Sequence, residues 1–522
     1  MQYDGPLDES DVDLPLPALS KPVLISVVAV KILVHVPGLF RYGYFRDELY
    51  FLDCARHLDW GYVDCAPLVA VYAKIALLLG GSLPALRILP MLAGMGMVAL
   101  TVLIARQLGG GTFAQAIAGV AILIAPVHLM IASILSMNAF EPLFWMGCIY
   151  VLIRIIRGGD PRLWLAFGVL AGLGLDNKHS TLFFGAAVAV AILATGLRRE
   201  LLKPWIWLGG LVALLIFLPN IVWQWQHGFP TLEDLQNVRA IGKNVELAPI
   251  PFLLQQMLMM HPGNLPVWLV GLWFLLVGHG RAFRAVGWIY ASLFVLFMVL
   301  HAKDYYLAPA YPMLLAAGGV AIEMWSTRIS GSCARVAVRY SIAGWLVLSG
   351  AILAPLALPL LSPADQVAYQ HKLGLDPPRS EVAHVGPLPQ LWGDQFGWPE
   401  LVEEVAEIYW ALPEDERSRT GIFAGNYGEA GAINLFGPQH GLPPAICAHQ
   451  THSMWGPGDF RGDTLIWLQW EPEWLEGRCG SVEVVGEHHN RWGMAEENGP
   501  ILLCRDLSPS LAEQWPELRH WN

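Results

Sequence analysis

The sequence predicts a multi-pass α-helical membrane protein that carries a small soluble α/β domain in its C-terminal part. Of the 522 residues, 55% are hydrophobic and only 14% are charged, whereas soluble domains average about 45–50% apolar and about 25% charged residues. The charge is also uneven, with a net charge of −15 after Leu361 and +4 up to that residue. Two parts of different physical character therefore meet near Pro363, and water-soluble enzyme classes are excluded.

The membrane part is defined by long apolar runs, because about 20 apolar residues cross a bilayer as one helix. Residues 1–21 are acidic and Pro-rich and lack the basic region and cleavage site of a signal peptide. We therefore expect a cytoplasmic N-terminus over 1–21 and a membrane domain over 22–361. About eleven spans are expected, near residues 22–40, 86–105, 113–132, 139–156, 162–177, 180–197, 205–223, 262–279, 283–301, 305–325 and 341–361.

The orientation of these spans follows from the basic residues, because short loops rich in Lys and Arg stay in the cytoplasm. Twelve Lys and Arg residues, from Arg106 to Arg339, cluster in alternate connections. If those loops lie in the cytoplasm, residues 41–85 form the first external loop. The apolar stretch Pro67–Leu79 within it must then not cross the membrane. This stretch is short for a span, so we expect a helix lying at the outer membrane face. The tail, 362–522, is then extracytoplasmic.

The spacing of apolar runs in the tail indicates a small α/β domain. A helix is expected over Leu401–Leu412 and a short strand over Gly421–Gly425, followed by a Gly-rich turn. Apolar runs indicate further strands at Leu465–Trp470, Val482–Val485 and Ile501–Cys504. Because the tail is acidic and would repel a phosphate backbone, no nucleic-acid partner is expected.

Seven cysteines leave the disulfide pattern open. Outside the cytoplasm, a bond between Cys54 and Cys65 or between Cys447 and Cys479 is an option. The sequence contains no CxxC and no HExxH motif. Spacing therefore gives no support to a structural zinc site.

The first external loop carries the richest set of polar side chains. Its carboxylates are interleaved with aromatic residues, a combination that suits a sugar, since hydroxyl groups need acceptors and the apolar ring faces stack on aromatic rings. The alternative is an ordinary solvated acidic loop. The acids are Asp47, Glu48, Asp53, Asp59 and Asp64, and the aromatic residues are Tyr42, Tyr44, Tyr50, Trp60 and Tyr62.

Polar residues also mark three other expected outer junctions. Lys178 and Lys303 are candidates to hold the phosphate of a lipid, although a cation at a membrane boundary is more often a snorkelling side chain. Glu141, close after Asn138, lies where a carboxylate is costly unless it is functional or paired with a neighbouring Lys or Arg. Both alternatives stay open for each residue.

Five segments between residues 41 and 318 together resemble the GT-C membrane glycosyltransferases, in particular the bacterial glycosyltransferase family 39 group. Relatives of that group include protein O-mannosyltransferases and lipid A aminoarabinose transferases. The segments are YFRDELYF, GYVDCAPLVAVYAKI, SMNAFEPLFW, GLDNKHSTLFF and KDYYLAPAYPMLLAAG.

The resemblance implies an inverting transfer of a sugar from a polyprenyl-phosphate donor to an extracytoplasmic hydroxyl or amine of a cell-envelope lipid, glycan or protein. It implies a bacterial inner membrane location. Asp47 would be the general base, and Glu48 would orient the acceptor or bind a metal. Lys178 and Lys303 would neutralise the donor phosphate.

The remaining implied roles concern substrate and metal binding. Glu141 would contact the sugar or place a divalent ion together with His261, and metal dependence stays open. The expected sugar- and acceptor-binding residues are Tyr44, Asp64, Asn138, Glu141, Tyr305 and Tyr306.

Two other functional classes compete with this interpretation. A transporter or lipid flippase is the main alternative, although transporters commonly show two related halves and the sequence shows no such symmetry. A non-catalytic scaffold whose acidic tail recruits partners is the third.

Overall fold

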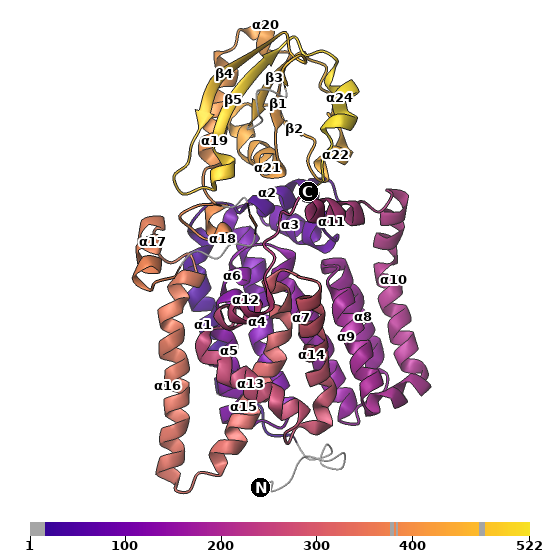
Figure 1. Cartoon of the computed structure of the whole chain (residues 1–522), viewed down its shortest axis with the longest axis vertical. Helices are drawn as coiled ribbons and strands as arrows, with labels where there is room; N and C mark the ends of the chain where they lie inside the picture. The colour runs from indigo at the N-terminus through magenta and orange to yellow at the C-terminus, as the bar shows by residue number, and fades with distance from the viewer. Residues whose placement is uncertain (1–15, 376–380, 383–384, 469–474, 522) are drawn as a thin grey trace. The chain divides into compact units, whose positions relative to one another are not determined.

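The computed structural model describes residues 16–375, 381–382, 385–468 and 475–521 (Figure 1). It divides into two compact units, each assembled from three separate stretches of chain. Unit 1 consists of Met1–Phe40, Arg87–Val222 and Glu246–Leu360. Unit 2 consists of Arg41–Leu86, Trp223–Val245 and Leu361–Asn522. Most of the predicted cytoplasmic N-terminus, residues 1–15, lies outside the described residues.

Unit 1 is built from helices that run along one another (Figure 1). Its elements are α1 (Lys21–His35), η2 (Val36–Phe40), most of α4 (Leu83–Gln107), α5 (Thr112–Leu123), α6 (Pro126–Met130), η3 (Ile131–Ser133), α7 (Met137–Ile156), α8 (Leu163–Asn177), α9 (Thr181–Ala194), η4 (Gly196–Leu202), most of α10 (Pro204–Gln226), α12 (Pro249–Met259), η5 (Pro262–Asn264), α13 (Leu265–Leu276), η6 (Arg281–Phe283), α14 (Arg284–Val299), η7 (Asp304–Ala310), α15 (Tyr311–Thr327) and α16 (Ser332–Ala357).

The predicted multi-pass helical class is confirmed. Within the described part of the chain, seven helices are long and apolar enough to cross a membrane, and two bent pairs raise the number to nine. The bends are 70° between α5 and the α6–η3 segment, and 102° between α9 and η4. Every apolar run expected from the sequence falls on helix, but α8 and α13 are shorter than a full span. The estimate of eleven spans counted these two.

Small residues let the central helices approach closely, as is common in membrane bundles. A Cβ atom at Gly271 of α13 would collide with the carbonyl group of Leu314 in α15, and one at Gly318 would collide with Val267 in return. Gly319 allows the same close approach of α15 to Ala114 of α5. These contacts fix α15 at the centre of unit 1.

Unit 2 combines the first loop region with the tail. Its elements are α2 (Arg46–Arg56), α3 (Leu68–Leu78), α11 (Pro230–Ala240), α17 (Pro363–Lys372), α18 (Gln390–Gly393), α19 (Trp398–Ala411), α20 (Glu414–Arg417), β1 (Thr420–Ala424), α21 (Tyr427–Phe436), η8 (Gly437–His440), β2 (Ala445–Cys447), α22 (His452–Trp455), β3 (Thr464–Leu468), β4 (Ser481–His488), η9 (Ala495–Glu497), β5 (Gly499–Arg505) and α24 (Leu511–Leu518).

The five strands form one mixed sheet in the order β2-β1-β3-β5-β4. β1 is parallel to both β2 and β3, whereas β5 is antiparallel to β3 and β4. The expected helix and the four expected strands correspond to α19, β1, β3, β4 and β5, and residues 469–470 of the strand expected at Leu465–Trp470 lie outside the described residues. The α/β character of this region is therefore confirmed. The three-residue strand β2 was missed because it is too short to show a periodic pattern.

Neither disulfide option from the sequence forms in this structure. Cys479 pairs instead with Cys504 of β5, with the two Cα atoms 5.6 Å apart. The antiparallel pairing of β4 with β5 brings Cys479, which precedes β4, beside the end of β5. Cys54, Cys65 and Cys447 are buried thiols.

The first loop is not an extended solvated segment. Residues 46–56 form α2, and nine of its eleven residues are buried. Leu49 of α2 belongs to the same apolar cluster as Val402 of α19 and Ile466 of β3. A Cβ atom at Gly431 of α21 would lie 2.7 Å from Leu49, so this glycine lets the two helices meet. The short helix expected over Pro67–Leu79 is present as α3.

Candidate functional site

Lys178 lies at the centre of a polar cluster in unit 1. It directly follows α8, and its ammonium nitrogen Nζ lies 2.7 Å from Asn138 Oδ1 and 3.1 Å from Glu141 Oε2, both on the first turns of α7. Glu141 also accepts a hydrogen bond from Ser180 Oγ. The Glu141 side chain is 2% exposed and that of Lys178 is 12% exposed. The pair is therefore almost fully withdrawn from water.

Two tyrosine rings of η7 line the same ammonium group. Lys178 Nζ lies 4.4 Å from the ring centroid of Tyr306 and 5.5 Å from that of Tyr305. Aromatic faces attract a cation at such distances. Lys303, the residue before η7, is half-buried. The cluster therefore offers a preorganised positive charge with aromatic walls.

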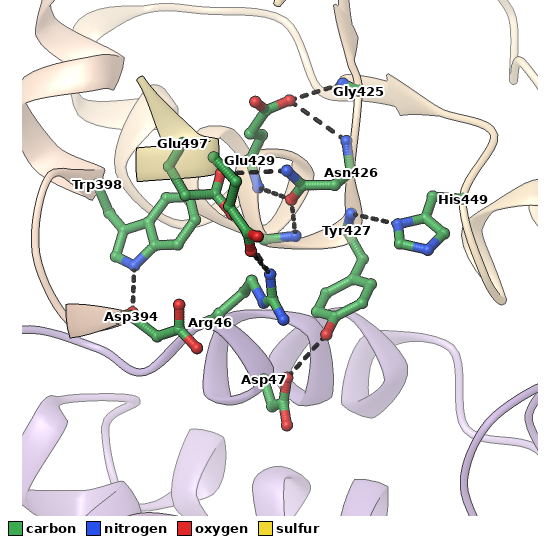
Figure 2. Close-up of polar contacts among 12 residues, drawn as sticks. Arg46, Asp47, Asp394, Trp398, Gly425, Asn426, Tyr427, Glu429, His449 and Glu497 are labelled. Carbon is green, nitrogen blue, oxygen red and sulfur yellow. Dashed lines mark hydrogen bonds and ion pairs between the residues drawn. The ribbon is translucent and has the colours of Figure 1, made fainter. Parts of the chain in front are cut away.

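Asp47 lies in a second cluster, in unit 2. It is in the first turn of α2, where carboxylates are favoured by the exposed N–H groups and the helix dipole. The neighbouring Glu48 is fully buried and accepts a hydrogen bond from the backbone N–H of Phe45 at 2.9 Å. Glu48 therefore caps the helix, while Asp47 Oδ1 accepts a hydrogen bond of 2.9 Å from the hydroxyl of Tyr427 (Figure 2).

The turn between β1 and α21 holds Tyr427 in place (Figure 2). Asn426 Oδ1 accepts from the N–H groups of Gly428 at 2.8 Å and Glu429 at 3.1 Å, and Glu429 Oε2 accepts in return from the N–H groups of Asn426 at 3.3 Å and Gly425 at 2.6 Å. This reciprocal arrangement is a capping box. Tyr427 is the first residue of α21, so the capped turn GNYGE fixes the backbone position from which its side chain extends.

The surroundings of Tyr427 are aromatic and charged. Its ring lies 4.9 Å from that of Tyr50 and 5.4 Å from the guanidinium carbon of Arg46. Arg46 pairs with Glu496 at 2.7 Å and with Glu497 at 3.5 Å. Burial raises the pKa of the Tyr427 hydroxyl well above its ordinary value. The phenol is therefore a donor, not an anion, beside Asp47.

Burial also shifts the acids around Arg46. It raises the pKa of Glu429, and the charge of Glu497 adds to that rise. It raises the pKa of Glu497 too, although the charge of Arg46 works against this. The acids in this cluster outnumber its single guanidinium group, so protonation of at least one of them is favoured near neutral pH.

Asp64 belongs to a third polar group of unit 2. Tyr50 Oη lies 2.6 Å from Asp64 Oδ1 and 2.6 Å from Thr451 Oγ1. Burial raises the pKa of Asp64 to about 7, with a further contribution from the charge of Asp234. The residue predicted to contact sugar or acceptor therefore titrates near neutral pH.

An acid–imidazole pair in unit 2 was not found from the sequence. Asp53 Oδ2 lies 3.0 Å from His452 Nε2, and Asp53 also accepts from Arg56 at 2.5 Å and Asn434 at 2.8 Å. Burial favours the neutral acid, but the hydrogen bond and charge of His452 prevail and hold the pKa of Asp53 below its ordinary value. The two residues are 399 positions apart, so no local motif could have joined them.

Some of the predicted site residues form one cluster in unit 1, and others belong to unit 2. Asn138, Glu141, Lys178, Tyr305 and Tyr306 come together in unit 1. Asp47, Glu48 and Asp64 belong to unit 2, as does Tyr44, whose hydroxyl donates to the carbonyl oxygen of Gly81 at 3.4 Å.

The residues proposed for a metal ion do not fit one. Glu48 caps α2, Glu141 is held by Lys178 and Ser180, and His261 Nδ1 accepts from the N–H of Gly263 at 2.9 Å. Across the described ranges, no three His, Cys, Asp or Glu side chains form a group that could bind a metal.

Comparisons with known proteins point to one class. A family model described as dolichyl-phosphate-mannose-protein mannosyltransferase matches residues 64–223. The search of curated proteins found no match. Among solved structures, ArnT from Cupriavidus metallidurans bound to undecaprenyl phosphate is 16% identical with a TM-score of 0.58, over 94% of this chain and 99% of that one.

A second solved structure has a similar fold. The archaeal oligosaccharyltransferase AglB from Archaeoglobus fulgidus, in complex with an inhibitory peptide and a dolichol-phosphate, is 10% identical with a TM-score of 0.51, over 85% of this chain and 69% of that one. The predicted resemblance is confirmed: the chain has the fold of the GT-C membrane glycosyltransferases. With the family-model match, this fold supports the predicted enzyme class, a multi-pass membrane glycosyltransferase.

Proposed function

We propose that this protein is an inverting glycosyltransferase that moves a sugar from a polyprenyl-phosphate donor to an acceptor on a cell-envelope lipid, glycan or protein. The observation that carries the proposal is the Lys178 cluster: a nearly buried ammonium group with aromatic walls at the ends of membrane helices. Polyprenyl phosphates are the lipids present in the two solved structures of similar fold.

The donor would bind through its phosphate. Lys178, together with Lys303, which lies two residues before Tyr305, supplies positive charge where the departing phosphate gains negative charge. Such preorganised charge is most effective where water is excluded. Tyr305 and Tyr306 flank the same ammonium group and offer ring faces to the sugar.

The acceptor would be activated by Asp47. In a single displacement, the acceptor oxygen or nitrogen bonds to the anomeric carbon while the bond from that carbon to the phosphate oxygen breaks. The acceptor proton passes to Asp47, and the polyprenyl phosphate leaves with the bonding electrons. One displacement from the opposite face inverts the anomeric centre. Tyr427 donates to Asp47 Oδ1, which orients the carboxylate and leaves Oδ2 to accept the proton.

The membrane arrangement follows from the basic loops. We propose that the protein lies in a bacterial inner membrane, with the alternate loops rich in Lys and Arg in the cytoplasm. Unit 2, with Asp47 and the α/β domain, would then face outward, where lipid-linked sugars meet envelope acceptors.

The decisive experiment is reconstitution of the reaction. The purified full-length protein is incubated with a panel of polyprenyl-phosphate sugars and extracted envelope fractions, with and without a chelator, and products are identified by mass spectrometry. We expect a glycosylated product that disappears in the Asp47→Asn variant. The contrary outcome is movement of lipid or solute across proteoliposomes without any transferred sugar, which would favour the transporter or flippase alternative.

A further inference from the structure

A large apolar groove opens in unit 1 between α13, α15 and α16. Its volume is about 630 Å³, and its lining includes Val267, Val270, Trp273, Ile322, Trp325 and Trp345. The site residues described above do not contribute to it. The groove is therefore distinct from the Lys178 and Asp47 clusters.

The groove exists because α16 packs only sparsely against the bundle. Of its 26 residues, only Leu346, Gly350 and Ala357 are buried. A Cβ atom at Gly350 would collide with Ile124, the residue that follows α5, so this glycine lets α16 approach the bundle closely at that point. Towards its start, α16 leaves Val336 and Tyr340 exposed at 49% and 75%. The space between this half of α16 and α15 is the groove.

One end of the groove is polar and basic. Arg328 Nη2 lies 3.1 Å from His279 Nε2, and both residues line the groove. This contact joins the connection between α13 and α14 to the connection between α15 and α16. The guanidinium group of Arg328 is exposed, so it remains open to an anion.

The charge around this end is uniformly positive. The connecting segments 277–284 and 326–340 contain no acidic residue and five arginines, namely Arg281, Arg284, Arg328, Arg335 and Arg339. Arg339 Nε donates to Ser326 Oγ at 2.9 Å and Arg335 donates to the carbonyl of Ile329 at 3.3 Å, which keeps both beside the Arg328 turn. The nearby carboxylate of Glu323 already accepts from Gly111 and Phe113 N–H groups.

We propose that this groove binds an anionic phospholipid, with an acyl chain along α15 and α16 and the headgroup phosphate at Arg328. Basic pockets between membrane helices on the cytoplasmic side bind anionic headgroups, and a guanidinium group suits a phosphate through paired hydrogen bonds. The tryptophan rings at the rim match the usual enrichment of this residue near membrane interfaces.

The position of the groove separates this lipid from the sugar donor. Lys178 contacts Tyr306 of η7, which leads directly into the start of α15, whereas Arg328 follows the end of α15. A 17-residue helix is about 25 Å long. The occupant is therefore a phospholipid of the leaflet opposite the Lys178 cluster.

Native mass spectrometry of the full-length protein in detergent tests the proposal. The protein is titrated with phosphatidylglycerol, with phosphatidylethanolamine of the same acyl chains, and with undecaprenyl phosphate. One arginine near an anionic lipid contributes about 1 kcal/mol, so Arg328→Ala should weaken phosphatidylglycerol binding about fivefold. Arg199→Ala, an exposed arginine of η4, is the matched control and should have no effect. Ser341→Trp, which fills the groove, should reduce binding of both phospholipids.

Three results would overturn the proposal. They are equal binding of the two phospholipids, equal effects of Arg328→Ala and Arg199→Ala, and undecaprenyl phosphate binding that depends on Arg328 more than phosphatidylglycerol binding does. Because the readout is lipid binding and not turnover, each result stands whether or not the protein transfers sugar.

Discussion

Two carboxylates of this protein, Glu141 in unit 1 and Asp47 in unit 2, have opposite surroundings. Glu141 is 2% exposed and is held by both Lys178 and Ser180. Asp47 is half-buried, and in the described part of the chain its one hydrogen-bond donor is the neutral phenol of Tyr427. Both carboxylate oxygens of Glu141 are engaged, Oε2 by Lys178 and Oε1 by Ser180. Glu141 therefore positions Lys178, whereas Asp47 keeps an oxygen available for chemistry.

The strongest test of this difference between the two carboxylates is to remove the charge of Asp47. Asp47→Asn should lower turnover by about 10²–10⁴-fold, the usual contribution of a general base. Product formation is measured by mass spectrometry with saturating donor and acceptor. Asp59→Asn, an exposed acid in the same region of unit 2, is the control and should keep normal turnover. Near-normal turnover of Asp47→Asn would remove this residue from the mechanism.

The pairing of Glu141 with Lys178 predicts a second effect. Lys178→Ala should raise the KM for the donor far more than that for the acceptor, and it should also destabilise the protein, because loss of one partner of a buried ion pair costs about 3–5 kcal/mol. The double variant Lys178→Ala/Glu141→Gln should regain stability, measured by thermal unfolding in detergent, but not donor affinity.

Lys303→Ala is the comparison variant for the phosphate role, because Lys303 is half-buried whereas Lys178 is almost fully buried beside Glu141. It should weaken donor use with a smaller loss of stability. An unchanged donor KM in both lysine variants would show that neither ammonium group binds the phosphate.

Tyr427→Phe tests whether the phenol orients Asp47. The ring packing against Tyr50 and Arg46 stays, and only the donated hydrogen bond is lost. A hydrogen bond to a charged group contributes about 1.5–3 kcal/mol, so kcat should fall about tenfold or more with little change in KM. Tyr409→Phe removes a half-buried hydroxyl elsewhere in the same domain and should leave kcat unchanged. Equal losses in the two variants would point to domain stability instead.

The last prediction concerns the pH dependence of stability. The pKa of Asp64 rises on folding from 3.8 to about 7, chiefly because of burial. Between these values the folded state binds more protons than the unfolded state, so this group makes stability fall as pH rises from about 4 to about 7. Above pH 7 its penalty is complete. Asp64→Asn should therefore stabilise the protein at pH 8 but not at pH 4, as measured by the difference in apparent Tm between variant and parent.

The sequence predicted the helical membrane class because hydropathy is a strong local signal, and each expected span falls on helix. It also predicted four of the five strands from apolar runs. The missed contacts are those with no local signature. Tyr427 and Asp47 are 380 residues apart, and Asp53 and His452 are similarly distant. The motif GNYGE was visible as a turn, but nothing in it identified Asp47 as the partner of its tyrosine.

The disulfide options failed for a related reason. Cys479 pairs with Cys504, and this partner is fixed by the antiparallel register of β4 and β5. Strand register depends on side-chain contacts across the sheet that spacing alone does not report. A pairing of Glu141 with a neighbouring Lys or Arg, in contrast, was one of the alternatives left open by the sequence, and the structure shows Lys178 as that partner.

Unit 2 is assembled from the early segment Arg41–Leu86, the middle segment Trp223–Val245 and the late segment Leu361–Asn522. Synthesis proceeds from the N-terminus, so Asp47 exists long before the ribosome reaches Tyr427. Every nascent or truncated chain that stops before β1 lacks the hydroxyl that steadies this carboxylate. Asp47 therefore gains the Tyr427 hydroxyl that orients it only after the described membrane helices have been synthesised.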